Sequence, residues 1–310
     1  MITLNETDRS ENSNETVALK VDVDTFCGTR DGIPNLLRIL DEFGVRATVY
    51  FSFGPDNSGK AVRRLLHKGF LAKMLRTKAP AMYGVKTMLY GTLLPAPMIG
   101  QGLPDVIRSV RDAGHEVGIH CWDHVDWHDH LHRFTPEQVE AALERAASTF
   151  ETIFSCRART CAAPGWTVSS ASLEIQDAMG FAYCSDTRGD SPFYPVLAGK
   201  RFKTLQIPST WPTMDELIGE NGVTAATVND VYLARLRPGL NVHTIHAELE
   251  GNAMIDTFRE LLTALSKRRV RFITLREAAN EYGTSAPPCN VEMGTIAGRA
   301  MPVALQKPSF

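Results

Sequence analysis

Residues 17–53 read VALKVDVDTFCGTRDGIPNLLRILDEFGVRATVYFSF, and this stretch decides the fold. Residues 17–24 alternate and are rich in β-branched side chains, which predicts a strand. Residues 33–43 carry apolar side chains at helical spacing, and Gly44 follows as a natural helix stop. Residues 46–53 read as a second strand. A strand, a helix and a strand in this order form a crossover unit, which favours parallel strands.

Strand and helix alternate about seven times along the chain, which predicts an α/β fold. Further helices are expected at residues 103–113, 135–154, 170–179, 228–236 and 253–267, and further strands at residues 116–120, 159–163, 181–185, 241–246 and 271–274. Clusters of polar residues follow the strands, at the rim where barrel enzymes carry their chemistry. We therefore expect a distorted (β/α)7-type barrel in preference to a doubly wound sheet.

A chain of 310 residues is ordinary for one α/β barrel, so a single domain over residues 1–310 is expected. The barrel should cover residues 15–283 and include an insertion at residues 57–104. The tail, residues 284–310, is expected to be loosely ordered because prolines and glycines recur in it. These residues are Pro287, Pro288, Gly294, Gly298 and Pro302.

Composition excludes several classes of protein. The net charge of −2 argues against a wholly basic nucleic-acid binder. The N-terminal residues include neither a basic start nor an apolar segment, so no signal peptide is expected. No apolar run approaches the roughly 18 residues of a membrane-spanning helix. The six cysteines form no CxxC pair and are expected to be reduced thiols, with metal ligation as the alternative.

Two carboxylates stand close together at the end of the first strand. Asp22 and Asp24 are two residues apart, so both point to one face if the strand is regular. Two like charges side by side are unfavourable unless a cation or a proton lies between them. The pair therefore indicates a metal or acid–base site, and capping of the following turn is the alternative explanation.

A histidine cluster follows the strand at residues 116–120. Six of the nine histidines fall between His115 and His132, and His120 and His124 are four residues apart. This spacing puts two imidazoles on one side of a helical turn. Together with Asp24 they form a mixed nitrogen and oxygen set for one divalent metal ion, and zinc, manganese, cobalt and nickel are not distinguishable. Three protein ligands leave open positions, which is typical of a catalytic site.

A third group of polar residues lies later in the chain. His246 is expected to face the rim at the end of a late strand, whereas His243 is more consistent with a structural position. Asp186 follows the strand at residues 181–185 and is expected to orient an imidazole. Trp166 follows another strand and is expected to form an aromatic wall, with simple packing as the alternative.

In this order the residues resemble the polysaccharide-deacetylase (NodB homology) superfamily, over roughly residues 17–280. The strings that carry the resemblance are KVDVDTFCGTRDGIPNLLRIL, RATVYFSFGPDNSGKAVRRLL, KTMLYGTLLPAP, GHEVGIHCWDHVDWHD, YCSDTRG and TIHAELEG. The resemblance implies a metal-dependent hydrolase of amide bonds with a NodB-type barrel. It implies metal ligands at Asp24, His120 and His124, catalytic residues at Asp22, His246 and Asp186, and substrate contacts at Gly165, Trp166 and Arg188. One departure is Thr167, which stands where the superfamily has an arginine that steers the catalytic base.

Within the superfamily these strings are most similar to deformylases of a lipid-linked aminosugar. This resemblance implies hydrolysis of the N-formyl amide of a 4-formamido-arabinose carried on undecaprenyl phosphate. Such an activity belongs to lipid A modification and to resistance against polymyxin and other cationic antimicrobial peptides. Two alternatives stay open, a NodB-type N-deacetylase of another carbohydrate and an inactive, membrane-recruited binding protein.

The insertion at residues 57–104 contains no aspartate or glutamate, and its cations are interleaved with aliphatic residues. This composition is typical of a segment that contacts anionic lipid headgroups and the acyl boundary. Only three aromatics accompany the cations, which argues against RNA binding, and a solvated helical hairpin is the other alternative. We expect a peripheral protein on anionic lipid at the cytoplasmic face of the inner membrane. The residues selected for lipid contact are Arg63, Arg64, Lys68, Lys73 and Arg76.

Overall fold

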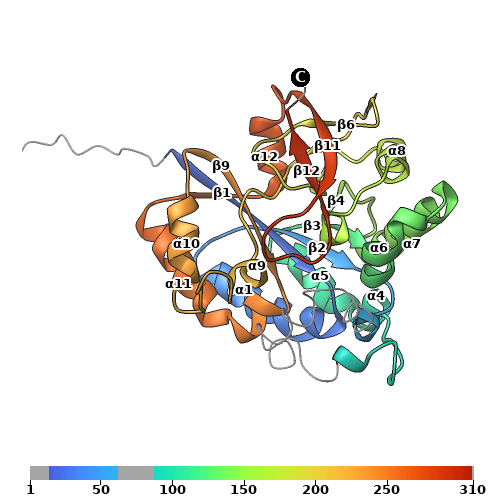
Figure 1. The fold of residues 1–310 in the computed structure, drawn as a ribbon. Coiled ribbons are helices and arrows are strands. Elements are labelled where there is room, and N and C mark those ends of the chain that lie inside the picture. The colour runs from blue at the N-terminus through green and yellow to red at the C-terminus, as the bar shows by residue number, and fades with distance from the viewer. Residues whose placement is uncertain (1–13, 62–86, 309–310) are drawn as a thin grey trace, which may run out of the picture.

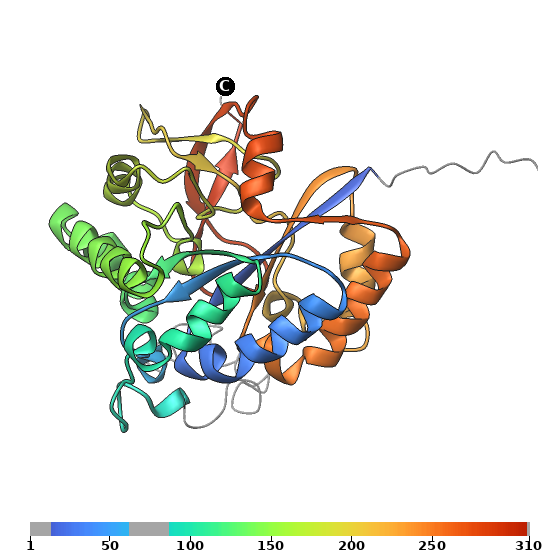
Figure 2. The ribbon, with the colours of Figure 1, turned by 180° about the vertical axis from the view of Figure 1, so that it is seen from behind.

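The computed structural model of the chain describes residues 14–61 and 87–308. Figures 1 and 2 show a curved sheet with helices along its outer side and a smaller sheet near the C-terminus. The five cations selected for lipid contact fall within residues 62–86 and lie outside the described residues. Among the described helices, none combines the length and the apolar character needed to cross a bilayer.

The first crossover unit forms as the sequence predicted. β1 (Glu15–Val23) and β2 (Thr48–Ser52) pair in parallel, and α1 (Ile33–Glu42) connects them. A π-helical turn, η1 (Gly28–Gly32), precedes α1. Successive side chains of β1 point alternately to two hydrophobic cores, one on each face of the sheet. Ala18 belongs to the core on the inner face. The side chains that pack against the helices on the outer face are Val17, Leu19, Val21 and Val23. The even-numbered residues of β1 therefore belong to the inner face of the sheet.

The main sheet has eight strands in the order β10-β1-β2-β3-β4-β5-β8, with β9 paired to β1. All of its pairings are parallel, as the alternating pattern predicted. The remaining strands are β3 (Glu116–Cys121), β4 (Thr160–Cys161), β5 (Tyr183–Cys184), β8 (Leu205–Gln206), β9 (Gly239–His246) and β10 (Arg271–Ile273). The sheet is a parallel half-barrel. Its two edges are joined by irregular backbone, since Thr210 N donates to Val242 O at 3.0 Å.

The helices cover the outer face of this half-barrel (Figures 1 and 2). The described helices are α4 (Ile99–Gly102), α5 (Pro104–Asp112), α6 (His124–His130), α7 (Pro136–Phe154), α8 (Ser170–Met179), α9 (Met214–Leu217), α10 (Val228–Arg235), α11 (Ile255–Lys267) and α12 (Leu275–Tyr282). Short turns are η3 (Thr87–Leu89), η4 (Leu131–Arg133), η5 (Pro164–Trp166) and η6 (Leu249–Ala253). The start of α7 is fixed by Thr135 as the N-cap, by Pro136 at the first helical position and by Gln138, which completes a capping box with Thr135.

The prediction of a loosely ordered tail is wrong for the part of the tail that is described. β11 (Pro288–Gly294) and β12 (Val303–Lys307) form an antiparallel pair, and β11 also pairs with β6 (Tyr194–Leu197), which pairs with β7 (Lys200–Arg201). Cys289, Val291, Val303 and Ala304 are buried in this small sheet. The prolines and glycines lie at the strand ends and in the loop at residues 295–302, where turns are required.

All six cysteines lie within the described residues and are free thiols. Cys161 and Cys184 are neighbours on adjacent strands, and their sulfur atoms are 3.3 Å apart. Burial raises the pKa of both thiols, so they behave as small apolar side chains at neutral pH.

Candidate active site

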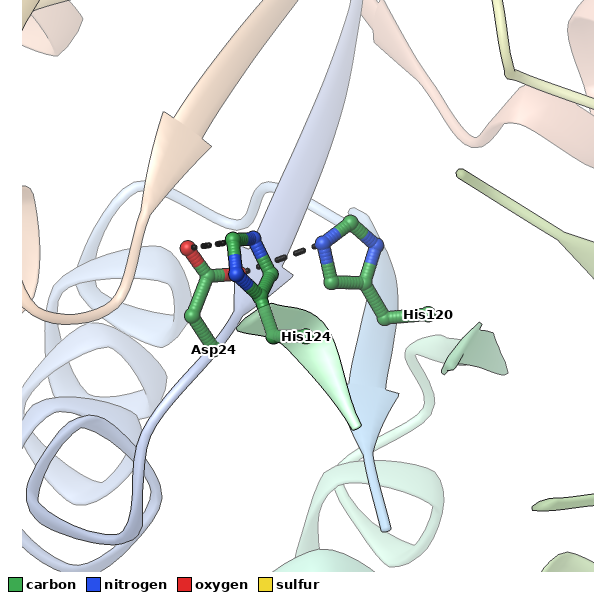
Figure 3. A group of neighbouring side chains, drawn as sticks. All are labelled: Asp24, His120 and His124. Atoms are coloured by element: carbon green, nitrogen blue, oxygen red, sulfur yellow. Dashed lines mark ion pairs between the residues drawn. The ribbon is translucent and has the colours of Figure 1, made fainter. Parts of the chain in front are cut away.

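Asp24, His120 and His124 meet at the carboxyl ends of two strands, as Figure 3 shows. Asp24 directly follows β1, His120 lies in β3 just before its end, and His124 is the first residue of α6. His120 Nε2 lies 3.2 Å from Asp24 Oδ1, and His124 Nε2 lies 3.3 Å from Asp24 Oδ2. The structure therefore brings together the three residues that the sequence analysis selected as metal ligands.

The turn between β3 and α6 is held by Asp123, which fixes where His124 stands. Asp123 Oδ1 accepts hydrogen bonds from the N–H groups of Val125 and Asp126, both at 3.1 Å. A carboxylate at this position satisfies two otherwise unpaired N–H groups and interacts favourably with the helix dipole. Asn57 donates to the second oxygen of Asp123 at 2.5 Å. His124 is therefore placed by the first turn of α6.

These three side chains fit a divalent cation. One ligand atom from each residue lies within 4.8 Å of the other two. Asp24 Oδ1 is buried and accepts no hydrogen bond from any described residue. Burial opposes ionisation of Asp24, but His124 and His120 outweigh it and hold the pKa of this carboxyl well below its usual range. An ionised, half-buried carboxylate with one imidazole near each of its oxygens is the arrangement that a mixed-ligand cation site needs.

Asp22 lies on the inner face of β1 beside this group and is buried. Its Oδ2 forms an ion pair with Lys20 Nζ at 3.0 Å, while its Oδ1 has no hydrogen-bond partner among the described residues. Lys20 is fully buried and also donates to Ser185 O at 3.2 Å. Thr167 replaces the arginine expected to steer the base, so the sequence does not identify the residue that steers it. In the structure the cation beside Asp22 is Lys20.

His246 ends β9 and is half-buried among carboxylates. Burial opposes its charged form, but Asp24, Asp215 and Asp22 together outweigh burial and raise the pKa of the imidazole. The backbone N–H of His246 donates to Glu250 Oε2 at 2.8 Å. The imidazolium form of His246 is therefore favoured by its surroundings, as a proton donor requires.

Asp186 does not lie in the position that the sequence analysis expected. Its Oδ1 accepts from Ala163 N at 2.7 Å, and its Oδ2 accepts from Gln206 Nε2 at 3.0 Å. The carboxylates that act on His246 are instead Asp24, Asp215, Asp22 and Glu250. Hydrogen bonds of the Asp186 carboxylate therefore link the segments at β4, β5 and β8. Asp215, on the short helix α9, is instead among the carboxylates that raise the pKa of His246.

Trp166 is buried, with 2% of its surface exposed. Cations cover its ring, because Lys20 Nζ, the Arg188 guanidinium and the Arg299 guanidinium lie 5.1, 4.7 and 4.8 Å from ring centres. Trp166 is therefore a packing residue here, the alternative that the sequence analysis kept for it. Gly165 has a φ of 59°, and a Cβ there would lie 2.0 Å from His128 Cδ2, so the turn leaves no room for a side chain.

Three acidic residues near the site were not selected from the sequence, namely Asp215, Glu248 and Glu250. Glu248 Oε1 accepts hydrogen bonds from Asp24 N, Thr25 N and Thr25 Oγ1 at 2.9, 2.8 and 2.8 Å. Burial and the charge of Asp24 raise the pKa of Glu248 to about 8. The string TIHAELEG contains Glu248 and Glu250, and two acidic residues two and four positions after the candidate histidine His246 are the signal that could have found them.

The chain is similar to known proteins in both its sequence and its fold. The sequence family described as polysaccharide deacetylase matches residues 9–184. A Shewanella sediminis (strain HAW-EB3) protein named a probable 4-deoxy-4-formamido-L-arabinose-phosphoundecaprenol deformylase is 39% identical over 84% of this chain and 85% of its own length. The protein of the same name from Wigglesworthia glossinidia brevipalpis is 31% identical over 90% of this chain and 98% of its own. The chain belongs to the polysaccharide deacetylase family.

Membership of this family makes the chain a hydrolase of amide bonds, as the resemblance implied. Solved structures show the same fold. A Mycobacterium smegmatis protein described as a polysaccharide deacetylase superposes with a TM-score of 0.61 at 19% identity, over 93% of this chain and 97% of its own. An allantoinase superposes with a TM-score of 0.60 at 14% identity, over 89% of this chain and 92% of its own. These likenesses establish the NodB-like α/β fold.

Proposed function

We propose that the chain is a metal-dependent deformylase. Its substrate would be 4-deoxy-4-formamido-L-arabinose linked to undecaprenyl phosphate, and its products formate and the free aminosugar. The observation that carries the proposal is the grouping of a candidate cation site, the buried carboxylate of Asp22 and a histidine whose pKa is raised, His246, at one end of the half-barrel. The names of two relatives that share most of the chain support this substrate. A part in lipid A modification and polymyxin resistance belongs to the same proposal.

Asp24, His120 and His124 would hold the divalent ion. When bound there, such an ion supplies Lewis acidity, which polarises an amide carbonyl and lowers the pKa of water. The mixed nitrogen and oxygen ligand set does not distinguish zinc from manganese, cobalt or nickel. The remaining chemistry falls to residues of the chain.

Asp22 would act as the general base. Its Oδ2 is engaged by Lys20, so the unpartnered Oδ1 is the atom to receive a proton from the water that attacks the formyl carbon. His246 would act as the general acid, because neighbouring carboxylates favour its protonated form. It would donate that proton to the amine nitrogen as the carbon–nitrogen bond breaks. One water is consumed, and one formate and one amine are released.

The direct test is mass spectrometry of the lipid-linked formamido sugar after incubation with the purified protein. Deformylation appears as loss of the mass of carbon monoxide from the substrate, together with an equal amount of formate in solution. A matched N-acetyl substrate distinguishes the proposal from a general N-deacetylase. Cleavage of the acetyl compound in preference to the formyl compound contradicts the proposed acyl group.

We also propose that the insertion attaches the enzyme to anionic lipid at the cytoplasmic face of the inner membrane. Each cation near such a surface contributes about 1 kcal/mol, and salt weakens the attraction. Charge reversal of the insertion should release the protein from anionic vesicles, whereas reversal of exposed cations elsewhere on the protein should not. The test set is Arg63, Arg64, Lys68 and Lys73, and the control set is Arg157, Arg201, Lys203 and Lys267. Equal vesicle binding by both variants contradicts this part of the proposal.

A further inference from the structure

The loop that follows β2 lies between the two loops that carry the candidate metal ligands. In the main sheet β2 pairs with β1 on one side and with β3 on the other, and all three strands are parallel. Asp24 directly follows β1, and His124 begins α6 after β3. None of the three candidate ligands lies on β2. Its carboxyl end meets the same rim, so the residues that follow it can reach both neighbouring loops.

Asp56 holds the loop after β1. Its Oδ2 accepts a hydrogen bond from the backbone N–H of Phe26, two residues after Asp24, at 2.9 Å. Its Oδ1 accepts from the backbone N–H of Ser58 at 3.1 Å, which fixes the orientation of the carboxylate. Asp56 is buried, with 1% of its surface exposed. Removal of this carboxylate would therefore leave the Phe26 N–H without its acceptor, at a cost in free energy.

Asn57, the next residue, holds the loop after β3. Its Nδ2 donates to Asp123 Oδ2 at 2.5 Å, and Asp123 directly precedes His124. The other oxygen of Asp123 caps the first turn of α6. One carboxylate therefore sets the start of the helix that carries a candidate ligand, and the Asn57 amide fixes that carboxylate.

The backbone of these two residues is itself held by the segment at residues 91–97. Asp56 N donates to Pro97 O at 2.9 Å. Gly91 packs directly on Asn57, because a Cβ on Gly91 would lie 2.3 Å from Asn57 Oδ1. The φ of Gly91 is 74°, a conformation that favours glycine. The side chains of Asp56 and Asn57 therefore extend from a backbone that later residues of the chain hold in place.

We propose that Asp56 and Asn57 are positioning residues that join the two ligand-bearing loops and set the spacing between Asp24 and His124. They act on opposite sides of β2, so each restrains one of the two loops. The inference rests on the proposed function, because that spacing matters only if Asp24 and His124 bind one ion. Residues that orient metal ligands without touching the ion typically change its affinity by about 10- to 100-fold.

Metal affinity tests the role of Asn57 without any catalysis. Competition with a chelator measures the affinity of the purified chain for Co²⁺. Asn57→Asp hardly changes the size of the side chain but places a second carboxylate against Asp123, and like charges repel. This variant should bind Co²⁺ about 10- to 100-fold more weakly. The exchanged pair Asn57→Asp/Asp123→Asn restores one donor and one acceptor, and asparagine caps a helix as well as aspartate does. It should recover most of the lost affinity.

A second pair of variants tests Asp56. Asp56→Ala should weaken Co²⁺ binding by a similar factor, whereas Asp56→Asn keeps an oxygen for the Phe26 N–H and should bind more tightly than Asp56→Ala. Asn229 provides the matched control, because its Nδ2 donates to Thr257 O at 2.9 Å between α10 and α11, away from both ligand-bearing loops. Asn229→Asp should bind Co²⁺ like the wild type. Thermal melting of the metal-free proteins checks that each variant folds, and separates a loss of stability from a loss of affinity.

The outcomes distinguish this inference from the proposed function. Equal affinity in the wild type and Asn57→Asp, or an exchanged pair no better than the single variant, overturns the role of Asn57. Equal affinity in the wild type and Asp56→Ala overturns the role of Asp56. A wild-type chain that binds Co²⁺ with the expected order of variants, yet does not cleave the formamido sugar, contradicts the proposed substrate and supports the positioning role. A wild-type chain that binds no divalent ion overturns both.

Discussion

Lys20 Nζ and Asp22 Oδ2 lie 3.0 Å apart on the inner face of one strand, and both side chains are buried. The cation and the carboxylate are two residues apart, so the strand itself brings them together. Such a pair fixes one oxygen of the carboxylate and leaves the other for a proton. This arrangement makes Lys20 a positioning residue for the proposed base.

The first prediction concerns this pair. Lys20→Met should lower kcat on the order of 10- to 100-fold, less than the full worth of a general base, because Asp22 stays in place but is no longer oriented. Lys20→Arg should recover part of the loss, since a guanidinium can still pair with the carboxylate. KM should change little in either variant. A Lys20→Met enzyme with normal kcat, or an arginine variant no better than the methionine one, contradicts the positioning role.

The second prediction separates the base from the metal ligands. Asp22→Asn should keep about one divalent ion per chain and lose activity by roughly 10²–10⁴-fold, the usual contribution of acid–base catalysis. His124→Ala should lose both the ion and the activity. Elemental analysis of the purified variants and the formate assay provide the two readouts. Full metal occupancy in His124→Ala would remove this residue from the ligand set.

A third prediction concerns Glu248, which holds the backbone of Asp24 and Thr25. Residues that orient metal ligands typically change affinity by about 10- to 100-fold when they are removed. Glu248→Ala should therefore weaken metal binding by about that factor. Glu248→Gln should bind nearly as the wild type does, because an amide oxygen accepts the same N–H donors. Competition with a chelator of known affinity measures both variants, and equal weakening in the two would assign the effect to charge instead of hydrogen bonding.

Local patterns were sufficient for the fold and for the three candidate ligands. The periodicity of the apolar residues predicts the strand at residues 17–24 and the helix at residues 33–43, because it reflects which face of each element packs on the core. His120 and His124 were selected on the four-residue spacing of a helical turn, but His120 lies in β3 and His124 begins α6, so the turn between the strand and the helix brings them together. These signals depend on neighbours in sequence, so the sequence alone carries them.

Pairings between distant segments were not recoverable in the same way. Asp215, on α9, acts electrostatically on His246 at the end of β9, and Asp186 is engaged instead by Gln206. No sequence pattern around Asp215 predicts that it acts on His246. Order in the tail likewise depends on pairing with β6, which lies about ninety residues earlier, and tertiary pairing of this kind overrides local composition.

The last prediction concerns His243, whose ring is buried between Trp211 and Tyr232 at centroid distances of 5.2 and 4.5 Å. Neither ring nitrogen has a hydrogen-bond partner among the described residues. Burial, together with the charges of His246 and Arg188, lowers the pKa of His243 from 6.5 to about 3. The folded chain therefore holds this imidazole neutral, whereas the unfolded chain protonates it near pH 6.5.

This difference fixes the sign of a pH effect on stability. Because the folded pKa is the lower one, the unfolded state binds more protons below pH 6.5, and the free energy of unfolding falls as the pH falls toward 3. At pH 5 the loss from His243 alone should be on the order of 2 kcal/mol. His243→Phe keeps an aromatic ring and cannot be protonated, so its unfolding free energy should fall less steeply between pH 7 and about pH 5. Urea unfolding of both proteins at the same metal concentration measures the two slopes, and the exposed His132→Gln serves as the control. Equal slopes in the wild type and His243→Phe would mean that the folded chain admits a proton, or water, to this ring.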